Sequence, residues 1–264
     1  MVRDRYEVPD AEVGIETRRL SALTSTRDRR TFRVIDRIGI NRGSICLEAG
    51  AGSGTISEGL ADRVGTAGRV WSVDKDLRFH QEMPPNVEVL DLDLAVDDLP
   101  EAHFDFVHAR AVLQHIPERD AVFRRLAAAT KPGGHMLVED SDMRAFAEQP
   151  LPEPFGTVHR RLASGALTPW RDPHFGSRLV ALFSREGFEE LGMDGAAGLM
   201  RPNHASGEWW LLGLDRALPH FLDAGEITSD QADACREQMR DASLVMLGPL
   251  MLAVWGRRPA HAGS

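Results

Sequence analysis

Residues 44–54 read SICLEAGAGSG, and this stretch decides the fold class. It begins as a short apolar run of the kind that forms a buried strand. Glycines at every second position, Gly50, Gly52 and Gly54, then allow the backbone to turn tightly and to approach a ligand closely. Residues 55–64 have the apolar spacing of a helix. The stretch therefore predicts a strand, a ligand-binding turn and a helix whose N-terminal N–H groups are free.

The spacing of this turn differs from that of a dinucleotide-binding fingerprint. The fingerprint is G-x-G-x-x-G, with a pyrophosphate at the helix N-terminus. Here the pattern is G-x-G-x-G, and Glu48 stands two residues before Gly50. A carboxylate at this position would repel pyrophosphate but would suit an ammonium group. The pattern favours a ligand with an amino-acid tail and speaks against a nicotinamide dehydrogenase.

Short strands and helices alternate beyond this point. We expect further strands over 69–73, 87–90, 104–109 and 135–139. The segments between them include helices over 74–83 and 117–130, and the Lys131–Gly134 stretch is a stop signal. Strands that alternate with helices in this way form parallel sheets.

The two ends of the chain are less regular. Residues 1–30 are polar and predict a solvated helical face, followed by a helix over 32–38. Residues 141–172 are rich in proline and predict an irregular segment with short helices, which either covers a crevice or is a surface insertion. A sixth strand is expected from 188, and a closing strand over 244–256 is expected to be interrupted at Pro249. The remaining predicted helices cover 175–186, 206–224 and 228–243.

Composition restricts the partners. The 264 residues include 31 Lys+Arg and 40 Asp+Glu, a formal net charge of −9. This balance disfavours nucleic acid, because binding to phosphates needs a basic surface. No apolar run approaches the length of about 18 residues that spans a membrane, and residues 1–10 lack the apolar segment of a secretory signal. With two cysteines, Cys46 and Cys235, we expect a reduced, cytoplasmic protein.

Acidic residues follow the second and third predicted strands. Asp74 ends the second strand, where its carboxylate can accept hydrogen bonds from both ribose hydroxyls. Asp93 follows the third strand and can accept from an adenine amine, while the N–H of Leu94 serves a ring nitrogen. Asp91 competes with Asp93 for this role.

Five blocks in this order resemble the class I S-adenosylmethionine-dependent methyltransferases. They are LEAGAGSG, VWSVDKD, NVEVLDLDLAVDDLP, FDFVHARAVLQHIP and LAAATKPGGHMLVED, and they cover about residues 44–140. Among the members of this family, the chain looks most like bacterial proteins that act on small metabolites. The resemblance implies a Rossmann-like, doubly wound, mainly parallel seven-stranded sheet with a helical cap. It also implies S-adenosylmethionine as cofactor and S-adenosylhomocysteine as product.

The resemblance assigns the cofactor-binding residues. Those that match the family's first motif, at the methionine and ribose part, are Glu48, Gly50, Gly52 and Gly54. Those that match the ribose and adenine positions are Asp74, Lys75, Asp93 and Leu94. After the fourth strand, the family packs backbone against the methionyl group at positions that correspond to His108, Ala109 and Arg110. One departure is about two extra residues between Asp93 and Leu99.

A general base is useful when the acceptor is a hydroxyl or an acidic carbon. His115 follows the fourth strand, where ligands bind in such sheets, and is the first candidate; His108 is the second. Glu139, Asp140 and Asp142 could hold a divalent ion, but without a matching partner motif we expect no metal.

The second half of the chain is expected to choose the acceptor. Trp209 and Trp210 cannot both face inward on one helix, so at least one faces a lid, a ligand or a partner subunit of a homodimer. Arginines that could recognise a carboxylate are Arg110, Arg144, Arg160 and Arg161.

These observations combine into one expected organisation. We expect a single methyltransferase domain over 1–264, with N-terminal cap helices over 1–38 and a cofactor-binding core over 39–143. Residues 144–264 form the substrate-side half, with a helical insert at about 202–243 and the closing strand. The expected activity is methyl transfer to an O, N or C atom of a small metabolite, in secondary metabolism. The alternative is a protein of the same fold that binds the cofactor and catalyses a cyclisation or rearrangement, or senses it.

Overall fold

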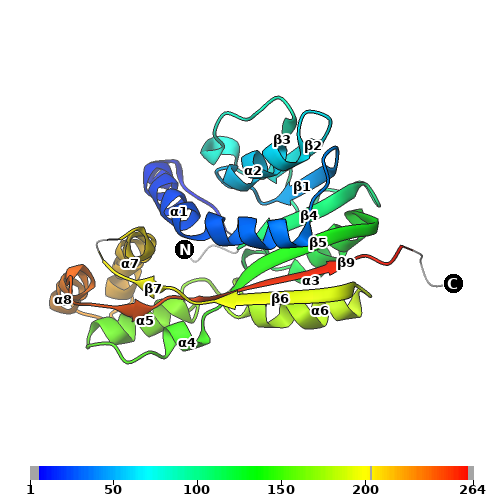
Figure 1. Ribbon diagram of the computed structural model, residues 1–264. Helices are drawn as coiled ribbons and strands as arrows, with labels where there is room; N and C mark the ends of the chain where they lie inside the picture. The colour runs from blue at the N-terminus through cyan, green and yellow to red at the C-terminus, as the bar shows by residue number, and fades with distance from the viewer. Residues whose placement is uncertain (1–5, 203, 261–264) are drawn as a thin grey trace.

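A seven-stranded sheet forms the centre of the molecule in the computed structural model, which describes residues 6–202 and 204–260 (Figure 1). Five of its strands run parallel in the order β3-β2-β1-β4-β5. Their bounds are β1 Ile45–Ala49, β2 Arg69–Asp74, β3 Val87–Asp91, β4 Phe104–Arg110 and β5 Thr130–Asp142. The predicted α/β fold with a mainly parallel sheet is confirmed.

Two strands complete the sheet beyond β5. The closing strand β9 (Leu250–Arg257) runs antiparallel between β5 and β6 (Glu189–Ala196). Before β9, the two-residue strand β8 (Met246–Leu247) pairs instead with β7 (Leu199–Met200) in a separate small sheet. The chain thus changes sheets at Pro249, and the predicted interruption is confirmed.

The strand order reverses between β1 and β4. From β1 the chain moves through β2 to β3 on one side, and from β4 it moves to β5 on the other. In open α/β sheets a crevice forms at the carboxyl ends of the strands at such a point. The register places Glu48 of β1 beside His108 of β4 there.

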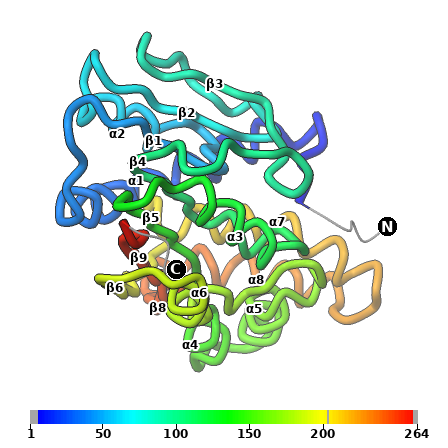
Figure 2. Tube along the Cα trace, turned by 90° about the vertical axis from the view of Figure 1, so that its right-hand side faces the viewer, coloured from blue at the N-terminus to red at the C-terminus, as the bar shows by residue number. Residues whose placement is uncertain are grey.

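Helices cover both faces of the sheet (Figures 1 and 2). On one face lie α1 (Val13–Ile38) and α2 (Thr55–Val64), whose Ile35 and Leu60 are fully buried against the strands. On the other lie α3 (Arg119–Ala129) and α6 (Leu179–Arg185), which contribute Phe123 and Phe183 to a second buried cluster. Burial on both faces explains why the central strands are almost continuously apolar.

Four helices form a cap with its own apolar core at one end of the sheet (Figure 1). They are α4 (Arg144–Ala147), α5 (Phe155–Ala163), α7 (Ala205–Asp223) and α8 (Ser229–Arg240). Phe146, Trp210 and Phe221 are buried in this core. Thr228 begins α8 with a capping box to Gln231, as its sequence indicates. The assignment of the whole chain to one domain stays a prediction.

The predicted helix over 74–83 is wrong. Only Leu77–Phe79 form a 3₁₀ turn, η2, within this segment. The Asp76 carboxylate accepts a hydrogen bond from the Arg78 N–H and closes this short turn. Pro84 and Pro85 follow soon after, and proline disfavours a helical residue before it. The connection from β2 to β3 is therefore mostly irregular.

The predicted solvated face over 1–30 is also wrong in part. After the 3₁₀ turn η1 (Asp10–Glu12), one helix, α1, runs through the segment, and its Glu16 is fully buried. Glu16 accepts hydrogen bonds from Tyr6, from Arg19 and from Arg216 of α7. The charged side chains are thus part of an interface between α1 and the cap. The remaining 3₁₀ turns are η3 (Leu113–His115) and η4 (Phe175–Arg178). Among the described residues, no helix is long and apolar enough to cross a membrane.

Candidate active site

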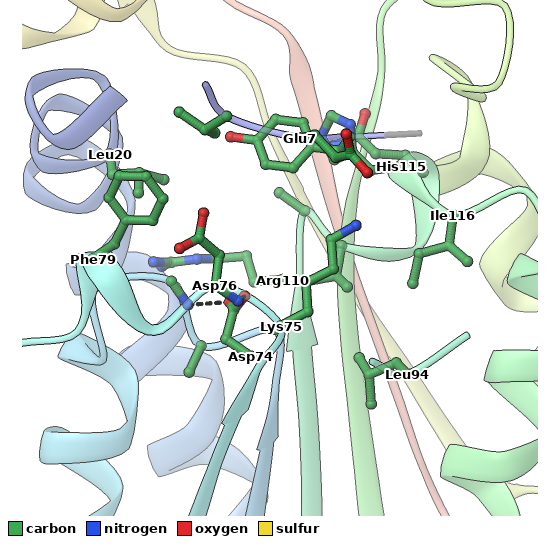
Figure 3. Close-up of a pocket in the computed structure, with 18 of the residues that line it drawn as sticks. Glu7, Leu20, Asp74, Lys75, Asp76, Phe79, Leu94, Arg110, His115 and Ile116 are labelled. Carbon is green, nitrogen blue, oxygen red and sulfur yellow. Dashed lines mark hydrogen bonds between the residues drawn. The ribbon is translucent and has the colours of Figure 1, made fainter. Parts of the chain in front are cut away.

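A cavity of about 1440 Å³ lies over the carboxyl ends of the strands at the crevice (Figure 3). Its floor consists of the segments that follow β1, β2, β3 and β4, and α1 lines its opposite side. Figure 3 shows Asp74, Lys75 and Asp76 on one side of this space, with His115 and Ile116 on the other. All five of these residues line the cavity.

The glycine turn has the geometry that its sequence predicts. Gly50, Gly52 and Gly54 have φ values of +75°, +57° and +82°, where side chains with a Cβ are strained. A Cβ on Gly50 would also lie 2.2 Å from Val112. No described atom lies within 4 Å of a Cβ built on Gly52, so this backbone borders open space. Gly54 is the N-cap of α2 and is not among the described residues that line the cavity.

Asp74 ties the second strand to the glycine turn. Its Oδ2 accepts a 2.8 Å hydrogen bond from the Gly52 N–H, and its Oδ1 accepts one of 3.0 Å from the Asp76 N–H. Burial raises the pKa of the Asp74 carboxyl, and the two N–H donors oppose this shift. Lys75 also lines the cavity. The predicted ribose-binding acid and the glycine turn therefore form one rigid unit.

The segment after β3 brings Asp93 and Leu94 to the cavity. The Asp93 carboxylate accepts a 2.8 Å hydrogen bond from the Ala95 N–H, and the Asp93 N–H donates to Asp97 at 2.7 Å. Leu94 is buried at the edge of the core. Asp91 lines the same cavity, so both acids remain candidates for the adenine edge.

Three buried side chains, those of Glu48, His108 and Glu139, are linked to one another. Within the described residues, Glu48 is the only one of the three that lines the cavity. His108 Nδ1 lies 2.6 Å from Glu48 Oε2, and His108 Nε2 lies 3.1 Å from Glu139 Oε1. All three side chains are at most 3% exposed. Burial alone would lower the pKa of His108, but the two carboxylates raise it to about 9. The imidazole is thus protonated at neutral pH and donates to both.

At the end of β4, the predicted cofactor-binding neighbours Ala109 and Arg110 lie in different surroundings. Ala109 is buried in the strand and does not line the described cavity, whereas Arg110 does. The Arg110 guanidinium donates to Asp28 at 2.7 Å and to Thr31 at 2.9 Å. These partners fix Arg110 against α1.

His115 lies in the cavity wall next to aromatic rings. Its ring centroid is 5.3 Å from that of Tyr6 and 5.9 Å from that of Trp170. Its Nδ1 has no hydrogen-bond partner in the part of the chain that the structure describes. Burial lowers the pKa of His115 well below the ordinary value, and the charge of Arg171 adds to this effect. The ring is therefore neutral and has an unused nitrogen.

The three acids at the end of β5 each have another partner. Glu139 binds His108, and Asp142 pairs with Arg144. Asp140 accepts hydrogen bonds from the Gln114 and Ser141 N–H groups, both at 3.0 Å. No cluster of three metal-ligating side chains occurs among residues 6–202 and 204–260.

The arginines singled out in the sequence are all paired with carboxylates. Arg110 pairs with Asp28, Arg144 with Asp142, Arg160 with Glu148, and Arg161 with Glu226. Polar side chains that line the cavity and that the sequence did not indicate include Tyr6, Arg19, Arg27, Gln114 and Arg171. They lie on α1, on the short turn η3 and on irregular segments, where no periodic pattern marks the inward face. Trp209 lines the cavity while Trp210 enters the cap core, as one helix requires.

Comparisons with known proteins identify the family. A family model described as a methyltransferase domain matches residues 23–198. Methyltransferase str3 of Strobilurus tenacellus is 32% identical over 138 residues, which are 52% of this chain and 50% of that protein. This chain thus spans about half the length of that curated relative.

Solved structures share the fold at low identity. A Haemonchus contortus phosphoethanolamine N-methyltransferase 2, in complex with phosphomonomethylethanolamine and S-adenosylhomocysteine, superimposes with a TM-score of 0.51 at 17% identity. The match covers 92% of this chain and 52% of that one. The [4+2]-cyclase SpnF superimposes with a TM-score of 0.53 at 16% identity, over 89% of this chain and 82% of its own. Since the family model covers more than half of the residues, the chain belongs to the class I S-adenosylmethionine-dependent methyltransferase family.

Proposed function

We propose that this protein binds S-adenosylmethionine in the cavity and transfers its methyl group to a small molecule in the same space. The observation that carries this proposal is one continuous cavity that joins the glycine turn and Asp74 to His115. Its volume of about 1440 Å³ exceeds the 300–1,000 Å³ that is typical of a pocket for one ligand. There is room for a cofactor and an acceptor together.

The residues present suit the cofactor. The space beside Gly52 lets the ligand approach the backbone closely. The buried hydroxyl of Ser53 lines the cavity without a hydrogen-bond partner in the described residues. Carboxylates border the cavity at Glu48 and Asp74, where an ammonium group and ribose hydroxyls need acceptors.

We assign the residues that would hold each group of the cofactor from the charge of that group. Asp74 takes the ribose, and Glu48 faces the ammonium group of the amino-acid tail. Arg27 of α1 suits the carboxylate of that tail, because it lines the cavity and forms no ion pair among the described residues. Its charged neighbours include Arg110 and Glu139, at the ends of β4 and β5.

When bound, S-adenosylmethionine supplies an electrophilic methyl carbon, whose bond to sulfur breaks with the electron pair returning to sulfur as the acceptor atom bonds to the carbon. The protein's part is to align the acceptor and to exclude water. Helix α1 and Trp209 of α7 line the cavity opposite the strands and restrict access of solvent. The neutral His115 can take the proton that the acceptor loses.

A labelled-methyl assay tests the proposal. The purified protein and methyl-labelled S-adenosylmethionine are incubated with phenols, carboxylates, amines and acidic carbon compounds. Transfer of label to at least one small molecule is expected. Tight cofactor binding without transfer across the whole set would favour a cyclisation, a rearrangement or a sensing role. A role in secondary metabolism, a cytoplasmic location and a homodimer stay part of the proposal.

A further inference from the structure

Besides Arg27, which we assign to the cofactor, a second guanidinium at the cavity has no carboxylate partner among the described residues. Arg171 lies in the irregular segment before η4 and lines the cavity. Its Nε and Nη2 both donate to Oε1 of Gln114, at 3.2 and 3.0 Å. Gln114 is a neutral amide, so it orients the guanidinium without neutralising it. Arg171 forms no ion pair with any residue that the structure describes.

The carboxylates that act on Arg171, those of Asp140 and Asp172, attract its charge, but neither forms an ion pair with it. Asp172 pairs with Arg178 at 3.0 Å. Asp140 is fully buried and bound by two N–H groups, and burial raises its pKa to about 7. Asp140 is therefore only partly ionised at neutral pH. Burial lowers the pKa of Arg171 to about 10, which still leaves the guanidinium charged.

Other cations strengthen the positive potential at this end of the cavity. Arg19, Arg119 and Lys75 act on His115 in the same sense as Arg171. Arg19 is balanced by Glu16, and Arg119 lies 3.9 Å from Asp172. Arg171 differs from Arg19 and Arg119 in that a neutral amide, and not a carboxylate, orients its guanidinium at the cavity.

We propose that the acceptor carries an anionic group, a carboxylate or a phosphate, which binds the Arg171 guanidinium beside His115. The inference rests on the proposed function, because it names the class of molecule that would be methylated. A guanidinium has five N–H donors in a planar fork. Gln114 uses two of them, so the others remain for the oxygens of an anion. The anion would hold the acceptor while its nucleophilic atom lies near the free nitrogen of His115.

Calorimetry on the protein saturated with S-adenosylhomocysteine tests this inference. Sodium succinate and inorganic phosphate are titrated separately at pH 7. Tighter binding of succinate indicates that the acceptor carries a carboxylate, and tighter binding of phosphate indicates that it carries a phosphate. At least one is expected to bind the wild type. Arg171→Gln should weaken that binding by about tenfold or more, since a charge-assisted hydrogen bond is lost. Arg171→Lys should retain part of the affinity, because the charge remains.

Arg185→Gln is the matched control, because Arg185 is exposed and pairs with Glu186. It should bind the anion as the wild type does. Equal anion affinity in Arg171→Gln and wild type, or no anion binding by the wild type, would overturn the inference. So would loss of S-adenosylhomocysteine affinity alone in Arg171→Gln, which would assign Arg171 to the cofactor. If the wild type fails to bind S-adenosylhomocysteine, the proposed function itself is contradicted, together with this inference.

Discussion

His108 of β4 contacts Glu48 of β1 through Nδ1 at 2.6 Å, in the register that places the two residues side by side. On its other side the same imidazole reaches Glu139 of β5. The contact holds the Glu48 carboxylate at the wall of the cavity, while the imidazole of His108 itself stays buried. His108 is therefore proposed as a positioning residue for Glu48, and His115 is the stronger candidate for a base.

Removing the imidazole should destabilise the fold. His108→Leu removes the cation that lies between two buried carboxylates, which costs about 3–5 kcal/mol of unfolding free energy. Urea denaturation followed by circular dichroism measures this loss. His135→Leu is the control, since His135 lies on β5 and is only partly buried. Equal stability of the two variants would show that the buried contact has no net value.

The same contact predicts a dependence of stability on pH. The pKa of His108 is about 9 in the folded protein and about 6.5 in an unfolded chain. A raised pKa contributes stability that is complete below pH 6.5 and is lost as pH rises through 9. The unfolding free energy of the wild type should therefore fall across this range more steeply than that of His108→Leu. Parallel pH profiles for the two proteins would contradict the assignment.

The base assignment predicts a loss of turnover with binding retained. His115→Ala should lower the rate of methyl transfer by about 100-fold or more if the acceptor must lose a proton. The affinity for S-adenosylhomocysteine should stay unchanged. His220→Ala, at an exposed position of α7, serves as control. Wild-type turnover in His115→Ala would reject the role of base.

Alanine substitutions at two glycines allow the effect of backbone strain to be distinguished from the effect of contact with the ligand. Gly52 and Gly43 have φ values of +57° and +85°, and no described atom lies within 4 Å of a Cβ built on either. Alanine at each should cost about 1 kcal/mol of stability through backbone strain. Only Gly52→Ala places a methyl group at the cavity, so it alone should weaken S-adenosylhomocysteine binding in a calorimetric titration. Similar weakening by Gly43→Ala would mean that strain, and not contact, is responsible.

The glycine turn and the position of Asp74 could be predicted from the sequence because their determinants are local. Positive φ values favour glycine, so Gly50 and Gly52 after a strand indicate a turn. Asp74 ends a strand that pairs with the next one in the chain, so its place at the edge follows from topology. These features depend on neighbours close in sequence or on a regular βαβ order.

The contributions of α1 and of the segment around Arg171 could not be predicted, because they depend on contacts between distant segments. Glu16 and Arg27 of α1 look like exposed polar residues until α7, about 190 positions later, packs over the helix. Arg171 stands in an irregular segment, and its orientation comes from Gln114 on η3. No periodicity distinguishes it from Arg160 or Arg161, which lie at the surface.

The most direct test of the central claim is a calorimetric titration of the wild type and Asp74→Asn with S-adenosylhomocysteine and, separately, with NADH. S-adenosylhomocysteine should bind one site per chain, and Asp74→Asn should weaken it by about tenfold or more through loss of a charge-assisted hydrogen bond. NADH should produce no binding heat. Binding of NADH without S-adenosylhomocysteine, or equal S-adenosylhomocysteine affinity in Asp74→Asn and wild type, would contradict the account.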